Sequence, residues 1–97
     1  MRFAARKDSN HTEVEKAFRE MLGDHVTDSS GWGNGAGDLF VSSGHFACFI
    51  EIKADEKKKT TAAQDKFRER HPEQWFRCNS VDHAIYLCKH IRATGSK

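Results

Sequence analysis

Two acids and a lysine have the types and spacing that best fit catalysis in this sequence. Asp38 is followed, after twelve intervening residues, by Glu51, Ile52 and Lys53. Two carboxylates suit a hard divalent cation such as Mg²⁺ or Mn²⁺, with the backbone carbonyl of Ile52 as a further ligand. The Lys53 ammonium would offset negative charge on a phosphate and help to position or deprotonate a metal-bound water. This pattern predicts metal-dependent phosphodiester hydrolysis; the alternative is an ordinary acid–lysine pair on a strand and an aspartate at a turn.

A β-hairpin is the element that must position these groups. Strand-like runs at residues 38–41 and 46–53 flank a short turn that contains glycine. If the turn is centred between residues 44 and 45, Asp38 lies opposite Glu51. Alternation of side chains then places the second acid and the lysine on one face of the hairpin. The opposite face is aliphatic and consists of Leu39, Val41, Ile50 and Ile52.

Periodicity predicts three helices and two further extended segments around this hairpin. Apolar residues recur at helical spacing in the first and last helices, and a T-x-x-Q capping box begins the middle one. The expected elements are helices at about 10–22, 61–71 and 80–91, an extended segment around Val26, and a strand at 75–78. The predicted fold class is therefore α/β, with a small mixed central β-sheet flanked by helices in the order αβββαβα.

Length and composition limit the architecture. Ninety-seven residues, 37% of them hydrophobic, predict one domain over residues 1–97, with its core at about 10–92 and a frayed tail at 93–97. No apolar run approaches the length of a membrane helix, and no apolar stretch follows the basic N-terminal residues. We therefore expect a cytoplasmic protein without a membrane partner.

The number and spacing of the cysteines predict that Cys48, Cys78 and Cys88 are reduced thiols in the core. They form an odd number, lack CxxC spacing and lie in apolar sequence. A zinc site is the alternative, but its four-residue gaps match no common zinc finger. That alternative set would be Cys78, His83, Cys88 and His90.

A glycine-rich segment at residues 29–37 precedes Asp38 and carries the aromatic residue Trp32. It lacks the GxxxxGK[ST] pattern and the following helix of a phosphate-binding P-loop, so we expect a mobile connection. Two roles for Trp32 remain open, stacking on a nucleic-acid base or capping the domain.

Four short motifs follow one another along the chain. They read GAGDLFV at the first strand of the hairpin, FIEIK at the second, TAAQDKF at the start of the middle helix and SVDHAI at the last helix. Together they resemble the VRR-NUC family of the PD-(D/E)XK nuclease superfamily. The resemblance spans roughly residues 10–92. It implies the restriction-endonuclease-like fold of that superfamily.

The resemblance also implies roles for individual residues. Asp38 and Glu51 match the metal-binding acids, Lys53 the motif lysine, and Gln64 the glutamine at the start of the following helix. Gln64 is also explained by its position in the capping box. Glu13 best matches the acid of the first helix, and Glu15 is the competing choice. The family's proline before the first acid is Gly37 here, which loosens the entry to the site.

By the same resemblance, the chain is expected to be a Mg²⁺- or Mn²⁺-dependent DNA endonuclease without an organic cofactor. Stand-alone members imply a homodimer that acts on branched DNA as a Holliday-junction resolvase does, since two sites related by a twofold axis could cut opposed strands. The alternatives are a structure-unselective or nicking endonuclease, a non-catalytic DNA-binding module, and a protein-interaction domain.

Basic residues follow the proposed site along the chain. Residues 1–52 contain five Lys or Arg and eight Asp or Glu, whereas residues 53–97 contain eleven and six. A DNA backbone held at the metal would run past the lysines just after the hairpin, and each phosphate contact would be salt-dependent. The alternative is a solvated surface. The predicted DNA-binding residues are Lys57, Lys58, Lys59 and Lys66.

Overall fold

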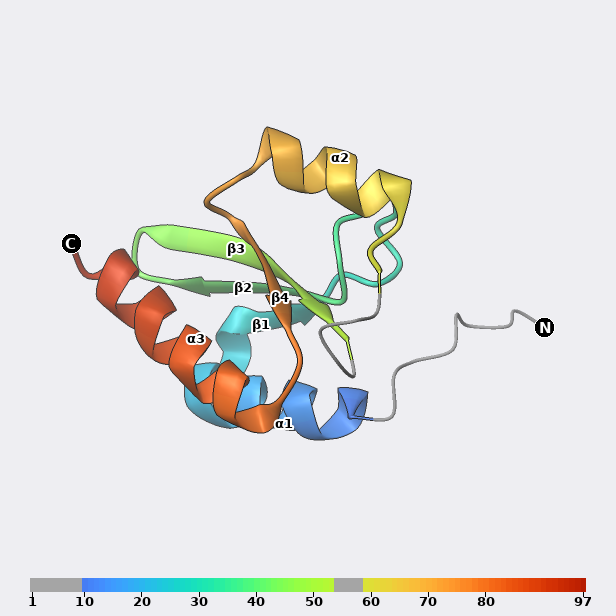
Figure 1. Ribbon diagram of the computed structural model, residues 1–97. Helices are drawn as coiled ribbons and strands as arrows, with labels where there is room; N and C mark the ends of the chain where they lie inside the picture. Colours follow the sequence, from blue (N-terminus) through green and yellow to red (C-terminus); the bar gives the residue numbers. More distant parts are fainter. Residues whose placement is uncertain (1–9, 54–58) are drawn as a thin grey trace.

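The computed structural model describes residues 10–53 and 59–97 as a small mixed α/β fold (Figure 1). Its helices are α1 (His11–Leu22), α2 (Ala62–Arg70) and α3 (Val81–Gly95), and a 3₁₀ turn (Gly23–His25) follows α1. Its strands are β1 (Val26–Asp28), β2 (Leu39–Ser43), β3 (Phe46–Ile52) and β4 (Trp75–Cys78). This sequence of helices and strands confirms the predicted order αβββαβα.

The four strands form one mixed sheet in the order β1-β2-β3-β4. β2 is antiparallel to both β1 and β3, whereas β3 and β4 are parallel. Phe40 pairs with Phe49 across the β2–β3 hairpin, and one residue before β2 the Asp38 amide donates to the Ile50 carbonyl at 2.8 Å. These contacts confirm the predicted register. Its physical cause is the two-residue turn, which fixes the residues that face each other.

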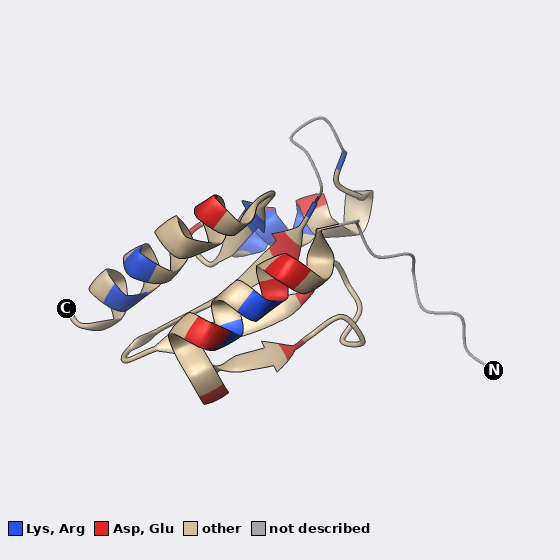
Figure 2. Ribbon diagram, turned by 90° about the horizontal axis from the view of Figure 1, so that it is seen from below, with Lys and Arg blue, Asp and Glu red and all other residues tan. Residues whose placement is uncertain are grey.

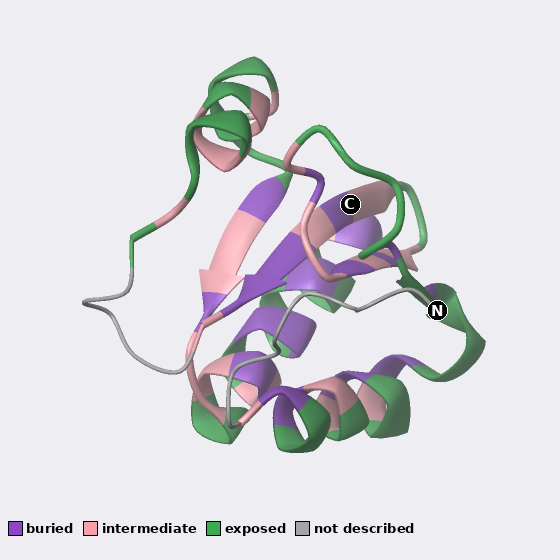
Figure 3. Ribbon diagram, turned by 90° about the vertical axis from the view of Figure 1, so that its right-hand side faces the viewer, coloured by how far each residue is buried: buried purple, intermediate pink, exposed green. Residues whose placement is uncertain are grey.

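Helices α1 and α3 cover one face of the sheet and α2 covers the other (Figures 1 and 3). The first face holds the hydrophobic core, where burial of apolar side chains provides the main stabilisation, about 25 cal/mol per Å² removed from water. Its buried residues are Val14, Phe18, Leu22, Val26, Leu39, Val41, Cys48, Ile50, Ile52, Cys78, Ala84, Leu87, Cys88 and Ile91. The aliphatic face predicted for the hairpin is thus part of this core.

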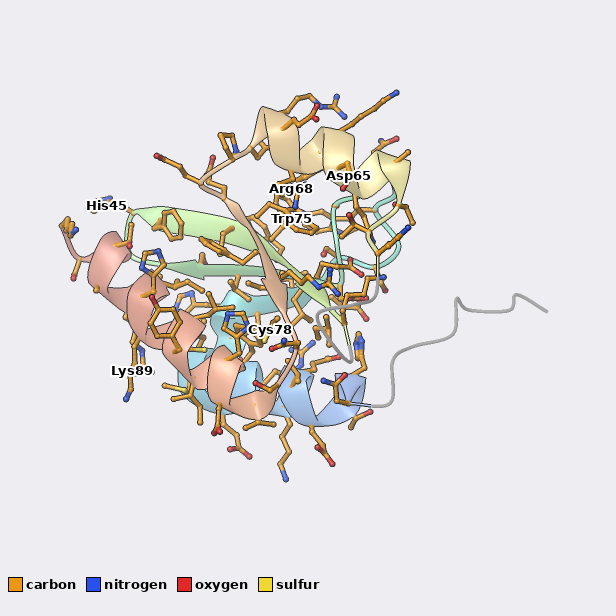
Figure 4. The ribbon with its side chains drawn as sticks, viewed as in Figure 1. His45, Asp65, Arg68, Trp75, Cys78 and Lys89 are labelled. Atoms are coloured by element: carbon orange, nitrogen blue, oxygen red, sulfur yellow. The ribbon has the colours of Figure 1, made fainter. Side chains whose placement is uncertain are left out.

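The α2 face of the sheet is covered by aromatic side chains instead of aliphatic ones. Phe67 of α2 packs edge-on against Phe49, with ring centroids 4.9 Å apart. Arg68 lies over the indole of Trp75, as Figure 4 shows, with its guanidinium carbon 5.8 Å from the ring centroid. No residue of α2 is fully buried. The helix therefore rests on the sheet through a few large side chains.

The C-terminal segment differs from the prediction. Helix α3 continues to Gly95, which is buried, so residues 93–95 are helical and do not fray. The Gly95 carbonyl accepts a hydrogen bond from the His45 amide at 3.0 Å. This contact with the β2–β3 turn holds the end of the helix in place, a tertiary effect that residues 93–97 alone do not reveal.

The cysteine prediction is confirmed, since Cys48, Cys78 and Cys88 are free and buried. Burial raises their pKa values to about 12, 11 and 11 respectively. None of the helices in residues 10–53 and 59–97 is long and apolar enough to cross a membrane.

Candidate metal centre

The two predicted acids lie side by side where β2 begins and β3 ends. Asp38 directly precedes β2, and its Oδ2 accepts a hydrogen bond from the Ile52 amide at 2.8 Å. Glu51 lies opposite it on β3 and is only 5% exposed. Lys53 Nζ lies 3.2 Å from Glu51 Oε2. The structure thus brings the two acids and the lysine together on one face.

The electrostatics of Glu51 are those of a crowded, buried carboxylate. Burial raises its pKa above the usual value, and the neighbouring charge of Asp38 raises it further. The Lys53 ammonium and hydrogen bonds from Lys53 and Gln64 act in the opposite direction. The net shift is upward, so the existing partners do not fully compensate the carboxylate charge. A divalent cation between the two acids would provide that compensation.

Of the two roles that the sequence left open for Gln64, the structure confirms the capping box, and it places the side chain beside Glu51. Its side-chain oxygen accepts from the Thr61 amide at 2.9 Å, while the Thr61 hydroxyl accepts from the Gln64 amide at 3.1 Å. This reciprocal pair is the predicted capping box at the start of α2. A hydrogen bond from the same Gln64 side chain also lowers the pKa of Glu51. The capping box therefore fixes the N-terminus of α2 beside the acids.

The first helix presents a histidine to the site. His11 is buried at 4% exposure, and its Nδ1 lies 3.9 Å from Asp38 Oδ1. Its Nε2 is 3.2 Å from Glu15 Oε1, and Arg19 holds the same glutamate through two nitrogen–oxygen contacts of 2.9 and 3.0 Å. Glu13, which the resemblance favoured as the acid of the first helix, is exposed on another side of α1. Glu15 is thus the acid linked to Asp38, through the histidine.

Two further residues at this centre, His11 and Arg77, were not predicted from the sequence. Arg77 is the register partner of Glu51 on β4, so both side chains start from the same face of the sheet. His11 begins the apolar stripe of α1, three residues before Val14, and its burial was foreseeable from that spacing. For Arg77 no local signal exists, because only the parallel pairing of β3 and β4 places it there.

Gly37, which directly precedes Asp38, adopts a backbone conformation that favours glycine. Gly37 has a φ of +102°, which proline with its φ near −65° cannot adopt. Its carbonyl accepts a hydrogen bond from the Ser29 hydroxyl at 3.0 Å, and the Ser29 amide donates to the Asp38 carbonyl at 2.9 Å. These bonds close the loop next to Asp38, so the entry to the acid is held tightly despite the glycine.

The glycine-rich segment is anchored more firmly than the predicted mobile connection. The Trp75 indole donates to the Gly35 carbonyl at 3.3 Å, and Ala36 is buried. Trp32 packs on Phe40 and Phe49, with centroid distances of 5.6 and 5.9 Å, yet is 52% exposed. It therefore does cap the aromatic face, and half of it still faces solvent.

The predicted DNA-binding lysines are only partly placed. Lys59 and Lys66 are exposed on the segment that leads into α2 and on α2 itself. Lys57 and Lys58 lie outside the described residues. Figure 2 shows that basic positions also occur elsewhere, on α1 and α3, and that α1 carries acidic ones as well.

The donor set at Asp38 and Glu51 fits a hard cation. In the described part of the chain, no three His, Cys, Asp or Glu side chains gather to hold a metal ion, which also applies to the alternative zinc set. Mg²⁺ usually takes one or two protein carboxylates and completes its shell with waters and substrate phosphate oxygens. Two adjacent carboxylates whose negative charges repel each other meet that requirement.

Searches against protein-family models and among curated proteins found no match to this chain.

Proposed function

We propose that this protein is a metal-dependent DNA endonuclease of the PD-(D/E)XK type. The observation that carries the proposal is the placement of Asp38 opposite Glu51, with Lys53 on the same face and 3.2 Å from the second acid. The mixed sheet with helices on both faces is compatible with the fold of that superfamily. The ordered motifs of the sequence supply the resemblance to VRR-NUC nucleases.

Each residue has a defined task in this proposal. Asp38, Glu51 and the Ile52 carbonyl would hold Mg²⁺ or Mn²⁺, which supplies Lewis acidity and an activated water when bound. The Ile52 amide orients Asp38, and Gln64 orients Glu51. Lys53 stabilises negative charge on the phosphate and positions the attacking water. His11 and Glu15 are positioning residues, because they act on Asp38 through the first helix.

We propose branched DNA as the preferred substrate and a homodimer as the active form. The support is the resemblance to stand-alone VRR-NUC nucleases, together with the symmetry argument that two paired sites match two opposed strands. A structure-unselective or nicking endonuclease is the competing activity, and a non-catalytic DNA-binding module or a protein-interaction domain is the competing class.

Cleavage assays on labelled four-way junction, flap, duplex and single-stranded DNA test the activity in Mg²⁺ and in Mn²⁺. We expect cutting that requires metal and falls at least about a hundredfold in Lys53→Met and Asp38→Asn, since each removes a charge needed in the transition state. Asn keeps an oxygen for the Ile52 amide, so the fold is retained. The control is Lys16→Ala, which removes an exposed lysine that pairs with Glu20 on α1.

Symmetric cuts confined to the junction would support the resolvase, and equal cutting of all substrates would support the unselective enzyme. Binding of DNA without cleavage in either metal would replace the enzyme with a binding module. Absence of both binding and cleavage would favour the protein-interaction domain.

A further inference from the structure

A hollow lies between the glycine-rich segment and helix α2. Its volume is about 240 Å³, and it is lined by Asn34, Ala62, Ala63, Lys66 and Arg70. The two walls touch closely, because a Cβ on Gly35 would lie only 2.3 Å from the Ala63 carbonyl oxygen. Asn34 of the glycine-rich segment thus forms one wall, and α2 forms the other with two alanines and two basic residues.

The charge of this hollow suits a phosphate group. Lys66 and Arg70 are exposed and lie one helical turn apart on α2. Within residues 10–53 and 59–97 neither side chain forms an ion pair, whereas the neighbouring Arg68 pairs with Asp65 at 3.6 Å. Arg70 Nε donates a hydrogen bond to the Lys66 carbonyl at 3.4 Å, which leaves the two terminal guanidinium nitrogens to bind phosphate oxygens.

An aromatic platform lies on the same segment. Trp32 precedes Asn34 by two residues, and its ring is fixed from one side by Phe40 and from another by Phe49. The remaining half of the indole faces solvent. An exposed ring held by two others can stack a nucleobase with little loss of conformational entropy.

We propose that the hollow and Trp32 together bind single-stranded DNA, with one phosphate between Lys66 and Arg70 and one base stacked on the indole. The proposal rests on the proposed function and extends it, because stacking requires a base that is not paired in a duplex. The surface adjoins the metal centre, since Gln64 follows Ala63 in the same helical turn and hydrogen-bonds to Glu51. Within the branched DNA of the proposed function, the substrate class is therefore DNA with an unpaired strand beside the scissile phosphate, as in a flap, rather than a fully paired four-way junction.

Intrinsic fluorescence tests the proposal without any cleavage. The chain has two tryptophans, and Trp75 is only 4% exposed, so Trp32 would report on stacking. The probe is an oligothymidylate of about ten nucleotides, titrated in EDTA. We expect quenching in the wild type and none in Trp32→Phe, where only the buried indole remains.

Affinity measurements test the phosphate contacts in the same titration. Lys66→Ala and Arg70→Ala should each weaken binding several-fold and reduce the slope of log affinity against log salt by about 0.7, as for one lost contact to a single strand. Trp32→Leu should weaken binding about tenfold while it retains an apolar side chain against Phe40 and Phe49. Lys16→Ala is the matched control and should bind as the wild type does.

Two results would overturn the proposal. One is quenching that is absent from the wild type or persists in Trp32→Phe; the other is affinity in the Lys66 and Arg70 variants equal to that of the control. The nuclease proposal fails separately, because metal-dependent cleavage is measured in a different assay. Quenching without cleavage would support the binding surface and contradict the nuclease proposal. Cleavage without quenching would contradict the binding surface alone.

Discussion

At the scale of single residues, Glu51 is where stability and proposed function conflict. The carboxylate is almost fully buried and faces a second acid, and both features raise its pKa. The folded chain therefore binds the Glu51 proton more tightly than the unfolded chain does. Once this group ionises, it lowers the stability of the metal-free protein. The same ionised form is the one that would bind a metal ion, so the proposed function comes at a cost in stability.

Glu51→Gln should gain stability relative to the wild type as the pH rises. The usual pKa of the group is 4.5 and the folded value is higher, so the wild type loses stability through that window while glutamine does not. The measurement is urea denaturation of both proteins in EDTA at about pH 4 and about pH 8. A stability difference that moves in favour of the wild type at the higher pH would contradict the assigned environment. In the separate cleavage assay with metal, the variant should show no activity at either pH.

At the scale of elements, the segment between β1 and β2 determines where α2 lies. Its backbone packs directly on Ala63, and its base is closed by hydrogen bonds from Ser29 to residues 37 and 38. The capping box of α2 then sets Gln64 beside Glu51. A substitution in the segment between β1 and β2 should therefore shift α2 and, with it, the position of Gln64 beside Glu51.

Gly35→Ala should destabilise the fold and lower any cleavage activity. The residue has a φ of +80°, and a Cβ would also clash with the carbonyl of Ala63. The left-handed conformation alone costs about 1–3 kcal/mol in a residue with a side chain, and displacement of α2 adds to it. Gly31→Ala is the control, because a Cβ there meets nothing within 4 Å. Thermal unfolding of both variants measures the effect, and equal melting temperatures would refute the close packing.

At the scale of the whole molecule, the sheet separates two environments. The face under α1 and α3 is an aliphatic core that contains all three cysteines, and the face under α2 carries the aromatic cluster. The acids and Lys53 start from that second face, at the end of the hairpin strands where α1 and α2 both reach them. The stabilising core and the chemical groups are therefore on opposite sides of one sheet.

The three thiols should react together and only on unfolding. Burial raises the pKa of Cys48 to about 12 and those of Cys78 and Cys88 to about 11, so the native protein has very little thiolate. With a disulfide reagent at about pH 8, we expect one phase whose rate equals that of global unfolding. In guanidinium chloride all three should react at once. Rapid reaction of one thiol in the native state would show that part of the core opens locally.

Much of the fold was predictable because its signals are local. Helical spacing in α1 and α3 and strand alternation in the hairpin are properties of neighbouring residues, and the turn fixes the pairing that places Asp38 opposite Glu51. The end of α3 was not predictable in this way. It is held by the contact between Gly95 and His45, which are fifty residues apart in the sequence.

The sequence by itself determined the order of the elements, the hairpin register and the shared face of Asp38, Glu51 and Lys53, since short-range backbone geometry dictates all three. Only the tertiary structure decided which groups surround these residues. It linked Glu15 rather than Glu13 to the site through His11, and it placed Gln64 and Arg77 next to Glu51. Such neighbours come from the packing of elements distant along the chain, and no local periodicity encodes that packing.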